Sequence, residues 1–284
     1  MEVAQKTYIC CFWKTYNMKE IIVRSISGVL YISIVIFSMF ASRELFISLF
    51  FILALLTLHE FLKLVHLKSY VSYVLLALAL YFIGYKVFDM NAVHLLLILT
   101  GFVNLFLFKD LITVHKIPMF EKKKYIVILF YIIGGFVFLT LIPFREGTFV
   151  PNIIIGVFML VWANDTFAYL IGKNFGKRKL FERISPKKTI EGFLGGLCGT
   201  ILASFVIFKY TELFDLNIWL SLAVIVTFFG TVGDLIQSKF KRQAGVKDSG
   251  SLMPGHGGLY DRLDSIIYTS PFIYAFLEIV DYVS

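Results

Sequence analysis

The longest polar stretch of this 284-residue chain is Gly233–Ser265, which reads GDLIQSKFKRQAGVKDSGSLMPGHGGLYDRLDS. It combines four aspartates, five lysine or arginine residues and six glycines. Carboxylates bind hard cations such as Mg²⁺, which usually takes one or two protein carboxylates together with substrate phosphates. Lysine and arginine neutralise phosphate charge, and glycine lets backbone N–H groups approach an anion closely. The stretch therefore predicts a site that holds a polyphosphate with a divalent metal.

The sequence on either side of this stretch is strongly apolar. The whole chain is 58% hydrophobic and only 16% charged, whereas soluble domains carry about 25% charged residues. One aqueous core cannot bury so much apolar surface, so the composition predicts a membrane protein. The net charge of +8 is explained by basic loops that set membrane orientation and contact anionic lipid. No nucleic-acid partner is expected.

Nine apolar runs approach the length that crosses a bilayer, since a hydrocarbon core of about 30 Å needs about 20 helical residues. They lie near 22–41, 45–62, 70–88, 92–108, 125–143, 150–171, 190–208, 216–236 and 265–283. We predict an all-α, multi-pass integral membrane protein with about nine transmembrane helices. Residues 1–17 are interpreted as a disordered extension, with Met18 as an alternative start. Residues 18–143 form about five N-terminal helices, and 144–284 form a catalytic region with polar loops 172–189 and 237–264.

Lysine and arginine are unevenly distributed between the loops on the two sides. With the N-terminus in the cytoplasm, all but four of the 27 Lys and Arg residues fall on the cytoplasmic side. The positive-inside rule therefore predicts a cytoplasmic N-terminus and, for an odd number of spans, a C-terminus on the opposite side. Both polar loops then face the cytoplasm at the cell's inner membrane, where nucleotides are available.

A second polar cluster begins inside the end of the sixth apolar run and continues beyond it. Asn164 and Asp165 lie just inside that run, where polar groups are costly and normally face a cavity, an ion or a partner. Alternatively, they form a polar helix end at the headgroup level. Further on, Ser185-Pro186-Lys187-Lys188-Thr189 predicts a turn into a helix whose N-terminus faces a phosphate. The basic residues 177–179 are explained by membrane orientation alone.

Both polar clusters resemble motifs of one enzyme family. The first contains Ser238-x-Phe240-Lys241-Arg242-x4-Lys247-Asp248-x-Gly250-x2-Met253-Pro254-x-His256-Gly257-Gly258-Leu259-x-Asp261-Arg262-Leu263-Asp264. This pattern is similar to the signature of the phosphatidate cytidylyltransferases, with Met253 where that family has Leu, Ile or Phe. The Asn-Asp-Thr element at 164–166 and the Ser-Pro-Lys-Lys-Thr-x-Glu-Gly element at 185–192 resemble it too. The resemblance implies transfer of CMP from CTP to phosphatidic acid, which gives CDP-diacylglycerol and pyrophosphate.

We assign roles to the acidic residues from their positions in the sequence. We expect Asp234 and Asp261 to be Mg²⁺ ligands and Asp264 to be a ligand or a neighbour of one. Asp165 is expected to be a further acid near the site. Alternatively, Asp261 or Asp264 only stabilises the start of a helix through its dipole.

The basic and small polar residues complete the predicted site. Lys241, Arg242 and Lys247 are expected to hold phosphate, with Lys241 and Arg242 acting in catalysis. Alternatively, part of this basic cluster contacts anionic headgroups. His256 is expected to hydrogen-bond a CTP phosphate or the base. The predicted substrate-binding residues are Asn164, Ser185, Lys187, Lys188, Thr189, Lys247, Asp248, His256, Gly257, Gly258 and Arg262.

Two other functions fit parts of the pattern. A cytidylyltransferase or CTP-dependent kinase for an isoprenoid lipid would use the same metal and phosphate chemistry. An ion-coupled transporter would use Asp165 and Asp234 as intramembrane acids, but such proteins often have repeated halves, and this sequence shows no repeat. The expected partners are CTP, phosphatidic acid and membrane lipids. The sequence does not determine whether the site holds one or two cations, or whether the protein is a monomer or a homodimer.

Overall fold

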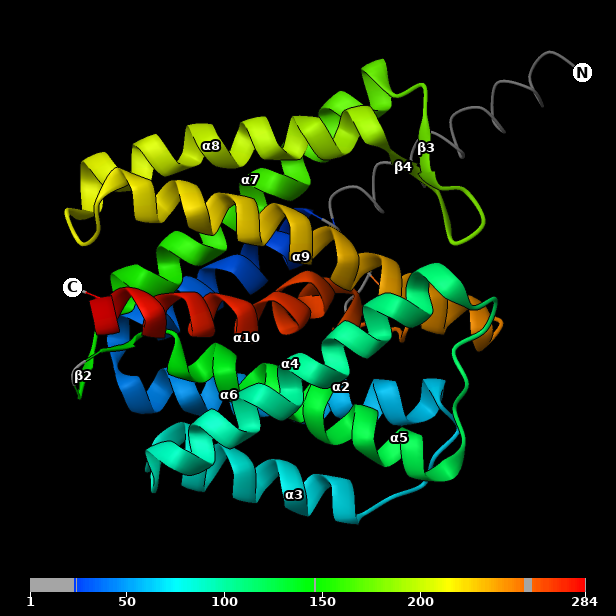
Figure 1. Cartoon of the computed structure of the whole chain (residues 1–284), viewed down its shortest axis with the longest axis horizontal. Helices are drawn as coiled ribbons and strands as arrows, with labels where there is room; N and C mark the ends of the chain where they lie inside the picture. The colour runs from blue at the N-terminus through cyan, green and yellow to red at the C-terminus, as the bar shows by residue number, and fades with distance from the viewer. Residues whose placement is uncertain (1–22, 24, 146, 253–256, 284) are drawn as a thin grey trace, which may run out of the picture.

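The computed structural model describes residues 23, 25–145, 147–252 and 257–283. Most of these residues are helical (Figure 1), which confirms the predicted helical class. The strands in the described residues form two short antiparallel hairpins. One pairs β1 (Phe144–Arg145) with β2 (Thr148–Phe149), and the other pairs β3 (Lys179–Phe181) with β4 (Ser185–Thr189). The predicted extension at 1–17 lies outside the described residues.

Within the described residues, seven helices are long and apolar enough to cross a bilayer. They are α2 (Arg43–Leu64), α4 (Met90–Thr113), the Glu121–Leu141 helix, α7 (Pro151–Phe175), α8 (Ile190–Thr211), α9 (Leu216–Gln243) and α10 (Tyr260–Val283). The Glu121–Leu141 helix comprises α5 (Glu121–Val127), a π-helical turn η2 (Ile128–Ile133) and α6 (Gly134–Leu141). The chain is thus a multi-pass membrane protein by the length and composition of its helices.

Two shorter apolar helices correspond to the other two predicted spans. They are Ser25–Ala41 and Val71–Tyr85, the latter made of α3 (Val71–Ala79) and the π-helical turn η1 (Leu80–Tyr85). Each predicted run therefore coincides with an apolar helix. The predicted count of nine spans exceeds the seven helices that reach full length in the described part of the chain, and these two shorter helices make the difference. Val71–Tyr85, for example, is too short to cross about 30 Å upright at about 1.5 Å per residue.

Helix starts follow from local sequence. Ser42 precedes α2 and its side chain accepts a hydrogen bond from the Leu45 amide, while Asp89 accepts one from the Asn91 amide at the start of α4. Such side-chain oxygens satisfy N–H groups that a helix leaves unpaired at its first turn. Pro151 occupies the first turn of α7, where its missing N–H carries no cost.

Two helices extend further into the polar stretch than the apolar runs predict. Helix α9 continues to Gln243 and α10 begins at Tyr260, so the predicted loop 237–264 is shortened to residues 244–259. Lys239 is buried, and its ammonium donates to the carbonyl oxygens of Asp110 (2.6 Å), Leu111 (3.1 Å) and Val114 (2.6 Å) at the end of α4. Because those carbonyls replace water around the charge, the helix continues through a residue that hydropathy assigns to a loop.

The helices pack as a bundle in which the C-terminal elements lie side by side (Figure 1). Helix α8 packs on α7 and on α9, and α9 packs on α10. An aromatic cluster then joins these helices to the N-terminal part of the chain. Its members are Phe61 on α2, Tyr131 on η2, Phe240 on α9 and Tyr260 on α10, and the Tyr131 and Tyr260 hydroxyls are 2.8 Å apart.

Three polar segments meet at one end of the bundle: the β3–β4 hairpin, the α4–α5 connection and the end of α9. The Arg183 guanidinium of the β3–β4 hairpin donates to the His115 carbonyl (3.0 Å), which lies between α4 and α5. The Gln243 side chain at the end of α9 donates to the Ile117 carbonyl in the same connection (2.7 Å). Figure 1 shows the C-terminus and β2 at the opposite end. The hairpin, the α4–α5 connection and the end of α9 therefore share one polar face.

Candidate active site

A cavity of about 330 Å³ opens between α7, the β3–β4 hairpin, α8 and α9. Its lining residues are Asn164, Asp165, Ala168, Tyr169, Leu180, Ser185, Lys187, Lys188, Thr189, Gly192, Phe193, Thr231 and Asp234. Seven of these were predicted as site residues from three separate parts of the sequence. The structure therefore joins the second polar cluster to the start of the Gly233–Ser265 stretch in one cavity.

The electrostatic centre of this cavity is the pair of Lys188 and Asp234. The Lys188 ammonium on β4 forms a salt bridge with the Asp234 carboxylate on α9. Asp165 on α7 and Asp264 on α10 interact electrostatically with Asp234, with Lys188 and with each other. Acids from three helices thus act on the electrostatics of one ammonium group, and Asp234 is the one in direct contact with it.

Close packing of α9 on α10 brings Asp264 beside Asp234. Gly233 precedes Asp234, and a Cβ atom at Gly233 would lie 2.8 Å from the Asp264 carbonyl oxygen. Only glycine permits this approach of the two backbones. One Asp264 carboxylate oxygen accepts a hydrogen bond from the Ser265 amide (3.0 Å).

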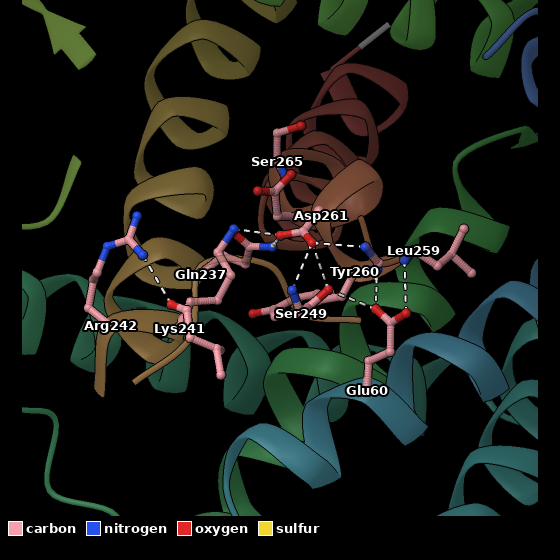
Figure 2. Close-up of polar contacts among 12 residues, drawn as sticks. Glu60, Gln237, Lys241, Arg242, Ser249, Leu259, Tyr260, Asp261 and Ser265 are labelled. Carbon is pink, nitrogen blue, oxygen red and sulfur yellow. Dashed lines mark hydrogen bonds and ion pairs between the residues drawn. The ribbon is translucent and has the colours of Figure 1, made fainter. Parts of the chain in front are cut away.

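Asp261, in the first turn of α10, lies at a second polar centre, where it meets α9 at Gln237 and Lys241, beyond Asp234 along that helix. One of its oxygens accepts hydrogen bonds from the Gln237 amide group (2.7 Å) and the Lys241 ammonium (2.5 Å). The other accepts from the Ser249 amide (2.8 Å), the Ser249 hydroxyl (3.0 Å) and the Gly258 amide (3.0 Å). Figure 2 shows these contacts around the carboxylate. The Asp261 side chain is only 9% exposed, and it does not line the cavity that contains Asp234.

Glu60 on α2 is a site residue that the sequence reasoning missed. It is 2% exposed, and its carboxylate accepts hydrogen bonds from the Leu259 amide (3.0 Å), the Tyr260 amide (2.9 Å) and the Ser249 hydroxyl (2.8 Å). The available signal was a single acid inside an apolar run, since intramembrane carboxylates are rare and normally have a specific partner.

A comparison with known proteins shows the family of this chain. The model of the cytidylyltransferase family matches residues 22–280. The chain belongs to the cytidylyltransferase family.

Curated relatives match this family member over part of its length. Over 122 residues it is 49% identical to the phosphatidate cytidylyltransferase of Staphylococcus haemolyticus (strain JCSC1435). It is 48% identical over the same length to the proteins of that name from Staphylococcus aureus (strain COL) and Staphylococcus epidermidis (strain ATCC 12228 / FDA PCI 1200). Each match covers 42% of this chain and 46% of the relative, so the chain spans a little under half the length of these relatives.

The other predicted site residues occupy several environments in this family member. Arg242 is exposed and donates to the Val246 carbonyl (3.0 Å), and Lys247 and Asp248 are exposed beyond it. Arg262 is also exposed and interacts electrostatically with Asp165. Gly257 has a left-handed backbone (φ +86°) beside Asp261. His256 lies outside the described residues.

The Ser-Pro-Lys-Lys-Thr segment corrects one local prediction. It forms strand β4 instead of the expected turn, and α8 begins directly after it. Pro186 is tolerated because this two-stranded sheet has only edge strands. The Thr189 hydroxyl accepts a hydrogen bond from the Gly192 amide (3.1 Å), so Thr189 starts the helix as well as lining the cavity.

The acids of this site fit a divalent cation. Among the described residues, no three His, Cys, Asp or Glu side chains already meet at metal-binding geometry. Mg²⁺ does not require such a preformed cage, because it usually takes one or two carboxylates and completes its shell with phosphate and water. The Lys188 ammonium pairs with Asp234 and interacts electrostatically with Asp165 and Asp264. The negative charge of these acids is therefore already offset in part by one positive charge, as a bound cation would offset it.

Proposed function

We propose that this protein is a phosphatidate cytidylyltransferase, which transfers CMP from CTP to phosphatidic acid and releases pyrophosphate. The observation that carries the proposal is the cavity at the polar end of an apolar bundle, where Lys188 pairs with Asp234 and Asp165 lies on the same wall. Asp264 on α10 interacts electrostatically with both Asp234 and Lys188. The curated relatives are phosphatidate cytidylyltransferases, which supports the lipid substrate, and family membership supports use of CTP.

The reaction needs charge control more than acid–base chemistry. A phosphate oxygen of phosphatidic acid attacks the α-phosphorus of CTP; a P–O bond forms there, and the bond to the β-phosphate breaks. The nucleophile is already an anion, so no strong general base is required. The barrier comes from bringing two anions together and from charge on the departing pyrophosphate. Positioned cations lower such a barrier.

The proposed division of roles follows from the observed pairs. Asp234, Asp261 and Asp264 would hold Mg²⁺, with Asp165 as a further acid, and the bound cation would offset negative charge on the phosphates. Lys188 pairs with Asp234, and Lys241 pairs with Asp261. Phosphate groups compete with carboxylates for both ammonium groups, so substrate binding would free the acids for the metal. Ser185, Lys187 and Asn164 line the same cavity and would contact substrate.

The proposed membrane arrangement has nine crossings in the cytoplasmic membrane, with the N-terminus inside and the C-terminus outside. The shorter helices Ser25–Ala41 and Val71–Tyr85 would cross where the bilayer thins locally around them. The positive-inside distribution of lysine and arginine supports this arrangement. The polar face that carries the β3–β4 hairpin and the α4–α5 connection also supports it, because both belong to segments assigned to the cytoplasm. Nucleotide would then enter from the cytoplasm and lipid from the bilayer.

The test is turnover by the purified full chain in detergent with Mg²⁺ and CTP. We expect release of pyrophosphate and formation of CDP-diacylglycerol when phosphatidic acid is supplied. Turnover with a polyprenyl phosphate but not with phosphatidic acid would favour the isoprenoid-lipid alternative. CTP consumption without pyrophosphate release would indicate a kinase.

A further inference from the structure

Glu60 connects a helix of the N-terminal part to the start of α10, 200 residues away in the chain. Its carboxylate lies within an apolar helix and is almost fully buried. A buried carboxylate is strongly unfavourable unless it is hydrogen-bonded. The three donors from Ser249, Leu259 and Tyr260 offset that cost, and Figure 2 shows them converging on Glu60.

Two of these donors belong to the beginning of α10. The first N–H groups of a helix lack partners within the helix, and a negative charge there is favourable. The Leu259 and Tyr260 amides point to the two different oxygens of Glu60. Glu60 therefore caps α10 from another helix, and the capped turn carries Asp261.

Glycine at two positions is required by this contact. A Cβ atom at Gly250 would lie 2.5 Å from one Glu60 oxygen, and one at Gly258 would lie 2.4 Å from the other. Any larger residue would displace the carboxylate. The glycines of this stretch were predicted to let the backbone approach an anion closely. At Gly250 and Gly258, that anion is the Glu60 carboxylate of the same chain.

Ser249 joins Glu60 to Asp261. Its hydroxyl lies 2.8 Å from a Glu60 oxygen and 3.0 Å from an Asp261 oxygen, and its single proton serves one of them at a time. Its amide donates to the same Asp261 oxygen. The two carboxylates therefore hold residues on both sides of the 250–257 segment, because Ser249 precedes it and Gly258, Leu259 and Tyr260 follow it.

We propose that Glu60 is a positioning residue for the reaction: by capping α10 and fixing Ser249, it sets the orientation of the Asp261 carboxylate. This inference rests on the proposed function, because it assigns Asp261 to the cation and substrate. Glu60 acts through its neighbours, since Asp261 accepts from Lys241, Gln237, Ser249 and Gly258 within a frame that Glu60 holds.

The decisive variant is Glu60→Gln in the full chain, with Glu44→Gln as its matched control. Gln keeps the side-chain volume but places an NH₂ group against N–H or O–H donors and removes the charge. Glu44 lies at the other end of the same helix and is exposed. In the metal-free protein, backbone hydrogen exchange over residues 258–262 should accelerate in Glu60→Gln and stay unchanged in Glu44→Gln. Unchanged exchange in Glu60→Gln would overturn the capping role.

Kinetics separate positioning from simple loss of folded protein. The Mg²⁺ concentration for half-maximal turnover should rise roughly 10- to 100-fold in Glu60→Gln, as is typical when a group that orients a metal ligand is lost. A merely structural role would instead lower turnover in proportion to the folded fraction, with the Mg²⁺ requirement unchanged, and would refute the proposal.

A second variant keeps the proposal testable if Glu60→Gln does not fold. Ser249→Ala removes the shared hydroxyl but leaves the hydrogen bond from the backbone amide of residue 249 to Asp261. The expected shift in Mg²⁺ requirement is therefore smaller than in Glu60→Gln. No shift would show that Glu60 does not act on Asp261 through Ser249. An inactive wild-type protein would refute the proposed function alone, because the hydrogen-exchange comparison still reports on the Glu60 cap.

Discussion

Lys188 on β4 forms a salt bridge with Asp234 on α9, across 46 residues of sequence. Neither side chain is fully exposed, at 28% and 22%, so water screens the pair less than it would a surface pair. Two further acids, Asp165 and Asp264, interact with the same ammonium. The lysine therefore offsets negative charge that a bound divalent cation would offset equally well.

Lys188→Ala should make the protein more dependent on Mg²⁺ for stability. Without the ammonium, the acids repel one another, and we expect the free energy of unfolding to fall by roughly 1 kcal/mol, as when one partner of a partly exposed hydrogen-bonded pair is removed. Added Mg²⁺ should raise the thermal midpoint of this variant more than that of wild type. Lys177→Ala, on the turn before β3, is the control and should respond like wild type. An equal Mg²⁺ response in Lys188→Ala and wild type would contradict a cation site here.

Asp234→Asn and Asp261→Asn should each abolish most turnover while the protein still inserts in the membrane. Loss of one preorganised charged group typically costs on the order of 100-fold or more in rate. The control is Asp215→Asn, an exposed acid immediately before the same helix, α9. Turnover is measured by pyrophosphate release. An active Asp261→Asn enzyme would remove Asp261 from the proposed metal ligands.

Lys241→Ala should raise the CTP requirement more than the Mg²⁺ requirement. The Lys241 ammonium lies 2.5 Å from Asp261 and is proposed to move to phosphate when CTP binds. Initial rates over a grid of CTP and Mg²⁺ concentrations measure both dependences. If the Mg²⁺ requirement shifts more, the main role of Lys241 is to hold Asp261.

Gly258→Ala should destabilise the protein and lower its turnover. The new methyl group would lie 2.0 Å from the Ser249 hydroxyl and 2.4 Å from Glu60. Gly101→Ala on α4 is the matched control, because nothing lies within 4 Å of its Cβ position. In that control, alanine in a helix is favoured over glycine by roughly 0.5–1 kcal/mol. Thermal midpoints in one detergent compare the two. A Gly258→Ala protein as stable as Gly101→Ala would show that the Glu60 contact is loose.

Lys239→Met should reduce stability without changing substrate requirements. Three carbonyl oxygens at the end of α4 would lose their donor, which costs about 1–3 kcal/mol when a buried polar group is left unsatisfied. Lys209→Met, at the exposed end of α8, is the control. The thermal midpoint and the KM for CTP are measured together. A raised KM with an unchanged midpoint would instead assign Lys239 to the substrate.

Most of the fold was accessible from sequence because hydrophobic length is a local property. Each of the nine apolar runs coincides with an apolar helix. The predicted helix ends are wrong where polar side chains bind distant segments. Helix α9 continues beyond Lys239 because the end of α4 supplies carbonyl oxygens. Helix α10 starts at Tyr260 because α2 supplies Glu60. Hydropathy counts such residues as polar and assigns them to loops.

By itself, the sequence determined a helical membrane protein with cytidylyltransferase motifs, because composition, run length and motif spacing are read along the chain. Only the tertiary structure decided which charges meet. It paired Lys188 with Asp234 and brought Asp165 and Asp264 into electrostatic interaction with that pair. It also paired Asp261 with Lys241 and placed Glu60 against Ser249, which is 189 residues away in the chain. The physical reason is that ion pairs and hydrogen bonds act over a few ångströms in space, whatever the separation along the chain.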